Sequence, residues 1–164
     1  MTRLSSRKRS GGFTIAELVT VVAIIGILAA VAMPVARFGF RRQKEIELRD
    51  RLRKITDAID RYHDLMTMPA PGGNAPAQMQ ALGSDGYPKD LDELLKGVKT
   101  ADSKTVHVIR ERDLIDPMTG RNDWITLSTT DDPDTTSSNK ANVYEVHSSS
   151  KALALDGKTH YNEW

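Results

Sequence analysis

Residues 10–19 read SGGFTIAELV and open an apolar stretch near the start of this 164-residue chain. From Leu18 to Ala36 the sequence is LVTVVAIIGILAAVAMPVA, nineteen consecutive positions without a charge. A helix of that length spans about 29 Å, enough to cross a hydrocarbon core of about 30 Å. The stretch therefore predicts one membrane-spanning helix. Pro34 cannot donate a backbone hydrogen bond within it, so we expect a kink there.

Basic residues flank the apolar run on both sides, so their count alone does not set its orientation. The cations before and after the run are Arg3, Arg7, Lys8, Arg9, Arg37, Arg41, Arg42 and Lys44. A cleaved secretory signal has a shorter apolar core, followed by a cleavage site of small residues. Here the run is long and continues into helix-forming sequence. An uncleaved signal anchor stays open as an alternative.

The segment from Gly12 to Pro34 resembles the class III signal peptide of type IV pilins and type II secretion pseudopilins, whose pattern is GFTLxELLVVxAIIGILAAxAxP. The resemblance implies that a prepilin peptidase cuts between Gly12 and Phe13 on the cytoplasmic side and then methylates the new amino terminus of Phe13. The apolar segment would then stay on the mature protein. The family also has a proline at the position of Pro34, where helix melting accompanies filament packing.

Glu17 places a carboxylate at the start of the apolar run. Such a charge is costly in lipid, so it is usually functional or paired. In the resembled family this glutamate is thought to neutralise the terminal amine of a neighbouring subunit during assembly. The alternative is that Glu17 only marks the headgroup boundary.

The amino-acid composition excludes several kinds of protein and of functional site. The absence of cysteine excludes a disulfide scaffold, a thiolate metal site and a cysteine nucleophile. The formal net charge is +1, and removal of residues 1–12 with their four cations leaves 19 cations against 22 acids, or −3. We therefore expect no nucleic-acid partner. The basic leader would stay in the cytoplasm and place the residues from Arg37 onward in the periplasm.

A second, amphipathic helical part is predicted from Arg37 to Met66. Its apolar residues are spaced three and four apart: Leu48, Leu52, Ile55, Ile59, Tyr62 and Met66. Acid-first pairs four residues apart are interpreted as the solvated face: Glu45–Arg49, Glu47–Arg51, Asp50–Lys54 and Asp57–Arg61. Pro69 and Pro71 end the helix. Whatever follows must cover the apolar stripe, which predicts an α+β, pilin-like lollipop.

The later sequence predicts a small head with a short antiparallel sheet. A loop over 68–86 is followed by a short helix over 90–96, with Asp90 in a capping box and Gly97 as its stop. Strands are expected over 105–109, 124–127, 142–147 and 152–155, with turns at 116–120 and at Asp156-Gly157. The domain prediction is therefore a leader at 1–12, a transmembrane half at 13–36, an amphipathic half at 37–66 and a periplasmic head at 67–164.

The head also resembles the major, G-type pseudopilin, as a divergent branch. The matching features are Tyr87-Pro88, Asp116-Pro117 with Gly120, Tyr144 to Ser148, Asp156-Gly157 and Trp164. The resemblance implies a non-enzymatic structural subunit of the type II secretion pseudopilus, anchored in the bacterial inner membrane with a cytoplasmic N-terminus. Its partners would be copies of itself, the prepilin peptidase, the inner-membrane assembly platform and minor pseudopilins. The alternative is a type IV pilus subunit for motility, adhesion or DNA uptake.

The sequence leaves open whether the head binds a calcium ion. G-type pseudopilins bind calcium near their C-terminus, and calcium takes six or more oxygen ligands. Carboxylates here could come from Asp131, Asp132, Asp134 and Asp156, but the family's loop spacing is not reproduced. A solvated acidic loop without any cofactor is the other interpretation.

A signal-anchored periplasmic enzyme is disfavoured, because the sequence has no catalytic motif and its four histidines lack metal spacing.

Overall fold

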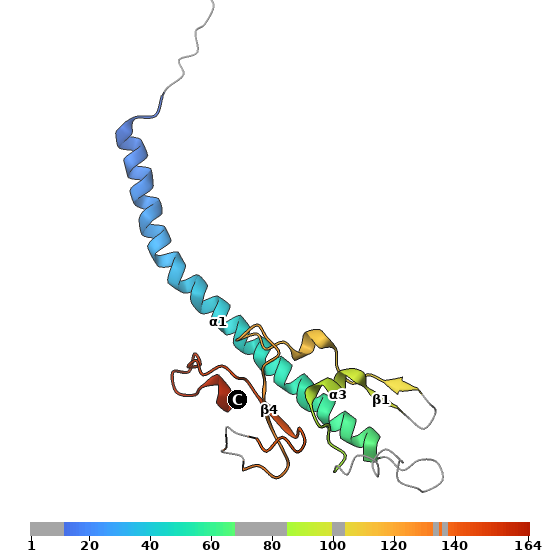
Figure 1. The fold of residues 1–164 in the computed structure, drawn as a ribbon. Coiled ribbons are helices and arrows are strands. Elements are labelled where there is room, and N and C mark those ends of the chain that lie inside the picture. Colours follow the sequence, from blue (N-terminus) through green and yellow to red (C-terminus); the bar gives the residue numbers. More distant parts are fainter. Residues whose placement is uncertain (1–11, 68–84, 100–103, 133–134, 136–137) are drawn as a thin grey trace, which may run out of the picture. The chain divides into compact units, whose positions relative to one another are not determined.

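The computed structural model describes residues 12–67, 85–99, 104–132, 135 and 138–164. One long helix, α1 (Ile15–Thr67), is followed by a short helix, α3 (Leu91–Lys96), and by two 3-10 turns, η1 (Glu111–Leu114) and η2 (Tyr161–Glu163). The strands are β1 (Val98–Lys99), β2 (Thr105–Val106), β3 (Ile125–Leu127) and β4 (Glu145–His147), as Figure 1 shows in part. The α+β class is as predicted.

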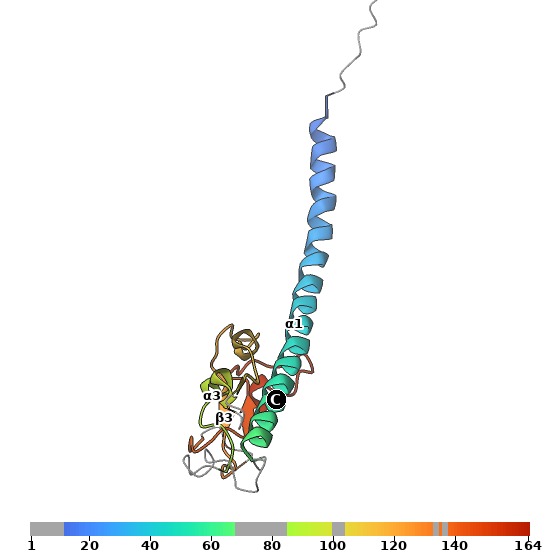
Figure 2. The ribbon, with the colours of Figure 1, turned by 90° about the vertical axis from the view of Figure 1, so that its right-hand side faces the viewer.

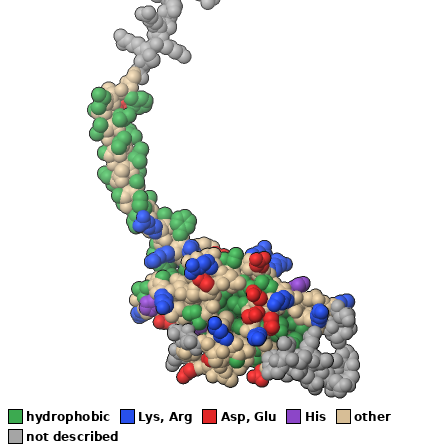
Figure 3. Space-filling view, viewed as in Figure 1, with side chains coloured by type: hydrophobic (Ala, Val, Ile, Leu, Met, Phe, Trp, Pro, Cys, Tyr) green, Lys and Arg blue, Asp and Glu red, His purple; other side chains and the backbone are tan. Residues whose placement is uncertain are grey.

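The chain divides into two compact units, residues 1–40 and residues 41–164. In the first unit the apolar side chains of α1 are uncovered, and Figure 3 shows them coating that part of the helix. The hydropathy and length of this stretch are sufficient to cross a membrane. An unburied apolar surface of this size is unusual for a protein in water, and a bilayer would cover it.

The second unit is built on the C-terminal half of α1. Figures 1 and 2 show α3, η1 and the strands gathered along this half of the helix. The core contains the predicted stripe of α1 together with side chains from the later elements. Its buried members are Ile55, Ala58, Ile59, Tyr62, Met66, Leu91, Leu94, Val98, Ile109, Leu114, Val143 and Val146. Leu48 of the predicted stripe is buried in a second cluster with Ala154 and Tyr161, and Leu52 is half-buried beside that cluster. The spacing of apolar residues thus predicted the buried face of the helix, with Leu52 only partly covered.

Helix α3 has the predicted cap. The Asp90 side chain accepts the Glu93 backbone N–H at 2.9 Å, and the Glu93 carboxylate accepts the Lys89 backbone N–H at 2.9 Å. Gly97 ends the helix with φ of +77°, and a Cβ there would lie 2.5 Å from the Val106 carbonyl oxygen. Glycine is therefore needed both for the backbone conformation and for the close approach of β2.

The sheet prediction was only partly right. Two separate two-stranded antiparallel sheets form, in which Val98 pairs with Val106 and Thr126 pairs with Val146. The strand expected over 142–147 begins only at Glu145, because the Val143 N–H donates to the Pro88 carbonyl outside any ladder. The strand expected over 152–155 is reduced to one bridge, Leu153 to His160.

Several charged residues of α1 do not form the solvated face that we predicted. The Glu45 carboxylate instead accepts the Tyr161 hydroxyl at 2.9 Å and the Leu155 N–H at 2.7 Å. Arg49 lies over the Trp164 ring, with its guanidinium carbon 4.4 Å from the ring centroid. Arg51 binds both Glu47 and Asp113 of η1. These side chains attach later segments to the helix, which periodicity along the helix alone does not reveal.

Candidate functional site

The start of α1 is defined by Thr14. Its hydroxyl accepts the Glu17 N–H at 3.2 Å, and its carbonyl accepts the Leu18 N–H at 3.2 Å. This is the geometry of an N-cap, which satisfies a backbone donor that the first helical turn leaves free. Gly12 and Phe13 therefore lie outside the helix, and the Phe13 side chain is 83% exposed.

The bond between Gly12 and Phe13 is accordingly part of non-helical chain. A Cβ placed on Gly12 would meet no other atom within 4 Å, so the described fold does not itself require glycine there. A requirement for glycine at this position would arise in the protease that binds the segment. The predicted scissile bond and the predicted helix start are thus adjacent but separate.

Glu17 lies in the first turn of α1 and is exposed. A carboxylate is favoured there by the partial positive charge of the helix N-terminus. The large apolar side chains that follow it along the first unit are exposed, from Leu18 at 61% to Phe40 at 73%. The helix continues through Pro34 without interruption, and the predicted kink stays a prediction. Glu17 is therefore an acid at the start of an apolar helical segment, and no described residue of the first unit covers the side chains of that segment.

Comparison with known families decides what this segment is. The family model described as the prokaryotic N-terminal methylation motif matches residues 7–33. Residues 7–33 therefore carry the class III signal peptide motif that is found in pilin- and pseudopilin-type proteins. The match covers the second half of the leader, the Gly12–Phe13 junction, Glu17 and most of the apolar run. No curated protein and no solved structure matches the chain.

The second unit contains a buried polar contact that the sequence did not lead us to predict. Asp116 is fully buried; its carboxylate accepts the Ser148 hydroxyl at 2.6 Å and the Met118 N–H at 2.7 Å. Its backbone closes the turn through a 2.7 Å bond from the Gly120 N–H. The turn at 116–120 was predicted, but its burial and its link to Ser148, next to β4, were not. Turn chemistry indicates a bend and does not say what covers it.

The aspartates proposed for calcium make local hydrogen bonds. The Asp131 carboxylate accepts the Ser128 N–H and the Ser138 hydroxyl, both at 2.8 Å, and these bonds, that of Ser128 first, lower its pKa. The Asp156 carboxylate accepts the Lys158 N–H at 2.8 Å and binds Thr159, which lowers its pKa to about 2. Asp132 is exposed, and Asp134 lies outside the described residues. Among the described residues no three acidic or histidine side chains are grouped as a metal site.

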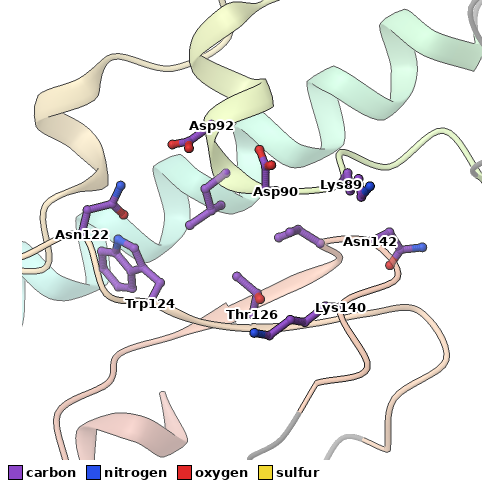
Figure 4. Close-up of a pocket in the computed structure, with 10 residues that line it drawn as sticks. Lys89, Asp90, Asp92, Asn122, Trp124, Thr126, Lys140 and Asn142 are labelled. Carbon is purple, nitrogen blue, oxygen red and sulfur yellow. The ribbon is translucent and has the colours of Figure 1, made fainter. Parts of the chain in front are cut away.

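A small pocket of about 310 Å³ lies between the start of α3 and the segments around β3 and β4. Figure 4 shows Lys89, Asp90 and Asp92 on one side of it and Thr126 and Lys140 on the other. Two of the lining side chains have structural tasks. Asp90 caps α3, and the Trp124 indole N–H donates to the Leu114 carbonyl at 2.6 Å. The pocket thus brings together parts of the framework, and we assign it no chemistry.

Proposed function

We propose that this pilin-type protein is a non-enzymatic structural subunit of the type II secretion pseudopilus. The observation that carries the proposal is the methylation motif on a helix whose apolar first half is left uncovered. In this proposal the prepilin peptidase removes residues 1–12, and the methylated Phe13 and the helix then remain in the inner membrane. The second unit stands in the periplasm, and the subunit adds to a filament with the assembly platform and minor pseudopilins.

Glu17 supplies the electrostatic step of assembly in this proposal. The mature N-terminus is an amine in or near lipid, where an uncompensated charge costs about 2.5 kcal/mol or more. The Glu17 carboxylate of an adjacent subunit would neutralise it once subunits are offset along the filament axis. Because the partner belongs to another copy, the pair favours assembly and leaves the fold of a single subunit unchanged.

Two observations support the pseudopilus over the type IV pilus. The chain has no cysteine, whereas many major pilins close a C-terminal loop with a disulfide. The features that resemble G-type subunits also serve the fold: Asp116 anchors its turn to Ser148, and Tyr87 stacks on His63 with ring centroids 4.3 Å apart. A pilus for motility, adhesion or DNA uptake is the alternative.

The test compares cells that carry the wild type, Glu17→Gln and the matched control Glu111→Gln, whose acid is exposed in η1. We expect equal amounts of the three proteins in the membrane. Cross-linking should give a ladder of oligomers for the wild type and the control and only short species for Glu17→Gln, with secretion of periplasmic substrates lost in parallel. Equal ladders with secretion retained would show that Glu17 is a boundary residue. Ladders with surface filaments and unchanged secretion would favour the pilus.

A further inference from the structure

A groove of about 690 Å³ lies in the second unit between α1 and the segment that contains η1. Its floor is apolar and is formed by Ala58, Val108 and Ile109. Its rim carries charged or titratable groups from both elements: Lys54, Asp57 and Arg61 of α1, and His107, Arg110, Arg112 and Asp113 from the facing segment. On the face seen in Figure 3, Lys and Arg side chains lie beside acidic and apolar ones.

The cations of this rim exceed what the rim's own acids neutralise. The Asp113 carboxylate binds Arg51, a residue that does not line the groove. Its Oδ1 is also 3.8 Å from Lys54 Nζ, and its Oδ2 is 4.0 Å from Arg112 Nε. Within the described part of the chain, Arg61 and Arg110 form no ion pair. Four permanent cations therefore line the rim beside two carboxylates. Asp113 is already bound by Arg51, and Lys54 is paired with Asp50 at 2.8 Å, so Arg61 and Arg110 are the rim cations without an acidic partner among the described residues.

His107 also lies at the rim of this groove. Its Nδ1 lies 2.9 Å from the Leu95 carbonyl oxygen, which can only accept, so Nδ1 carries the proton. The ring is exposed at the groove.

We propose that this groove binds a short acidic segment of a partner protein, with carboxylates against Arg61 and Arg110 and apolar side chains over Ala58 and Ile109. Lys54 and Arg61 lie seven residues apart on α1, about 10.5 Å along the helix axis. An extended peptide covers that distance with about three to four residues. Planar guanidinium groups bind carboxylates through two parallel hydrogen bonds, so the two arginines would orient the peptide carboxylates as well as neutralise them.

The groove suits a peptide better than a nucleic acid. A phosphodiester backbone offers no donors, so Asp57 and Asp113 would only repel it. A peptide presents N–H groups that Asp57 can accept, and its side chains can cover the apolar floor. Single-stranded nucleic acids also depend on aromatic side chains for stacking, and His107 is the one aromatic ring among the residues that line the groove.

The test uses the full-length chain extracted in detergent micelles and a rhodamine-labelled peptide, Asp-Val-Glu-Leu-Asp, followed by fluorescence anisotropy at low salt. The neutral comparison is Asn-Val-Gln-Leu-Asn, and the second comparison is a single-stranded oligodeoxynucleotide of equal charge. We expect binding of the acidic peptide, which weakens with added salt, and little binding of either comparison. The measurement needs no assembled filament, so its outcome is independent of the proposed pseudopilus.

Three variants test whether the peptide binds in this groove. The double variant Arg61→Gln/Arg110→Gln should weaken binding about tenfold, since two charge pairs with the peptide are lost. Asp57→Asn should tighten binding about threefold, because the variant removes a repulsive charge and keeps a side-chain oxygen that can accept a peptide N–H. A misfolded protein could not show this gain. The matched control, Arg53→Gln/Lys151→Gln, removes two exposed cations outside the groove and should change binding less than about twofold.

Several results would overturn the proposal. These are no binding of the acidic peptide at millimolar concentration, equal binding of the neutral peptide, and equal losses in the groove and control variants. If the oligodeoxynucleotide bound as tightly as the peptide and depended on the same two arginines, the groove would be a general polyanion site and the peptide assignment would be wrong.

Discussion

At the scale of single residues, two buried or half-buried carboxylates link distant parts of the second unit. Asp116 links its turn to Ser148, and Glu45 links α1 to Tyr161 and Leu155. In each case removal of the carboxylate leaves donors that water does not readily reach. The cost of such unsatisfied donors is about 1–3 kcal/mol each, which is a large share of the stability of a small domain.

We expect Asp116→Ala to lower the free energy of unfolding by about 2–4 kcal/mol, because the Met118 N–H and the Ser148 hydroxyl both lose their acceptor. Ser148→Ala should cost about 1–2 kcal/mol, and the double variant less than the sum of the two. Chemical denaturation of the four proteins measures this coupling. Asp60→Ala, at an exposed position on α1, is the control and should cost under about 0.5 kcal/mol. Additive losses would mean that the two side chains do not interact.

Two tyrosines predict how stability depends on alkaline pH. Burial, followed by its bond to Glu45, raises the pKa of Tyr161 to about 12, and burial with the nearby Glu93 raises the pKa of Tyr62 to about 12. An unfolded tyrosine titrates near pH ~10, so the folded state holds more protons between about pH 10 and 12. Stability is therefore complete below about pH 10 and falls as the pH rises toward about 12.

Thermal melts from about pH 9 to 12 check this expectation. The melting temperature of the wild type should fall across the window, and the fall should be shallower in Tyr161→Phe, which has no proton to release. Parallel curves for the two proteins would contradict the assigned pKa of Tyr161.

At the scale of elements, α1 places equivalent side chains in opposite environments. Ile55 is fully buried against the core, and Ile46 on the same helix is 55% exposed. Ile55→Ala should cost about 2–5 kcal/mol, because the substitution removes buried carbons and leaves a cavity. Ile46→Ala, the matched control, should cost under about 0.5 kcal/mol. Similar losses in urea denaturation would show that the predicted stripe is not the face that the second unit covers.

The acidic loop offers a second test at this scale. Bound calcium at a hundredfold excess over its Kd would stabilise the fold by about 2.7 kcal/mol. Because Asp131 and Asp156 each make local hydrogen bonds, we expect the melting temperature to be the same in calcium and in chelator. A higher melting temperature in calcium, abolished by Asp131→Asn or Asp156→Asn, would instead establish the ion site that the resemblance implied.

The sequence predicted some of these elements better than others, for a physical reason. Helix α1, the cap of α3 and the buried stripe follow from local chemistry and periodicity, so they could be predicted from neighbouring residues. The ends of β3 and β4 depend on which distant carbonyl each N–H meets, as the bond from Val143 to Pro88 shows. Glu45 and Arg49 could not be assigned to Tyr161 and Trp164, because their partners lie more than one hundred positions along the chain.

At the scale of the whole molecule, the methylation motif could be predicted from the sequence, because the residues that make it up are consecutive. Phe13, Thr14 and Glu17 lie within one turn of the helix start, and the methylation motif spans them. The sequence did not show that Thr14 caps the helix, which leaves the Gly12–Phe13 bond outside it. In the proposed function, processing and assembly would both use this one short segment.

The most direct measurement is the intact mass of the protein extracted from the membranes of cells that contain a prepilin peptidase. We predict one species that begins at Phe13 and carries a single added methyl group on its amino terminus. Replacing Gly12 with a bulky residue should give the uncut chain instead, and the open space around Gly12 makes misfolding a poor explanation for that result. A stable mature wild-type protein that begins at Met1 or Thr2 would contradict the processing and assembly proposed for this chain.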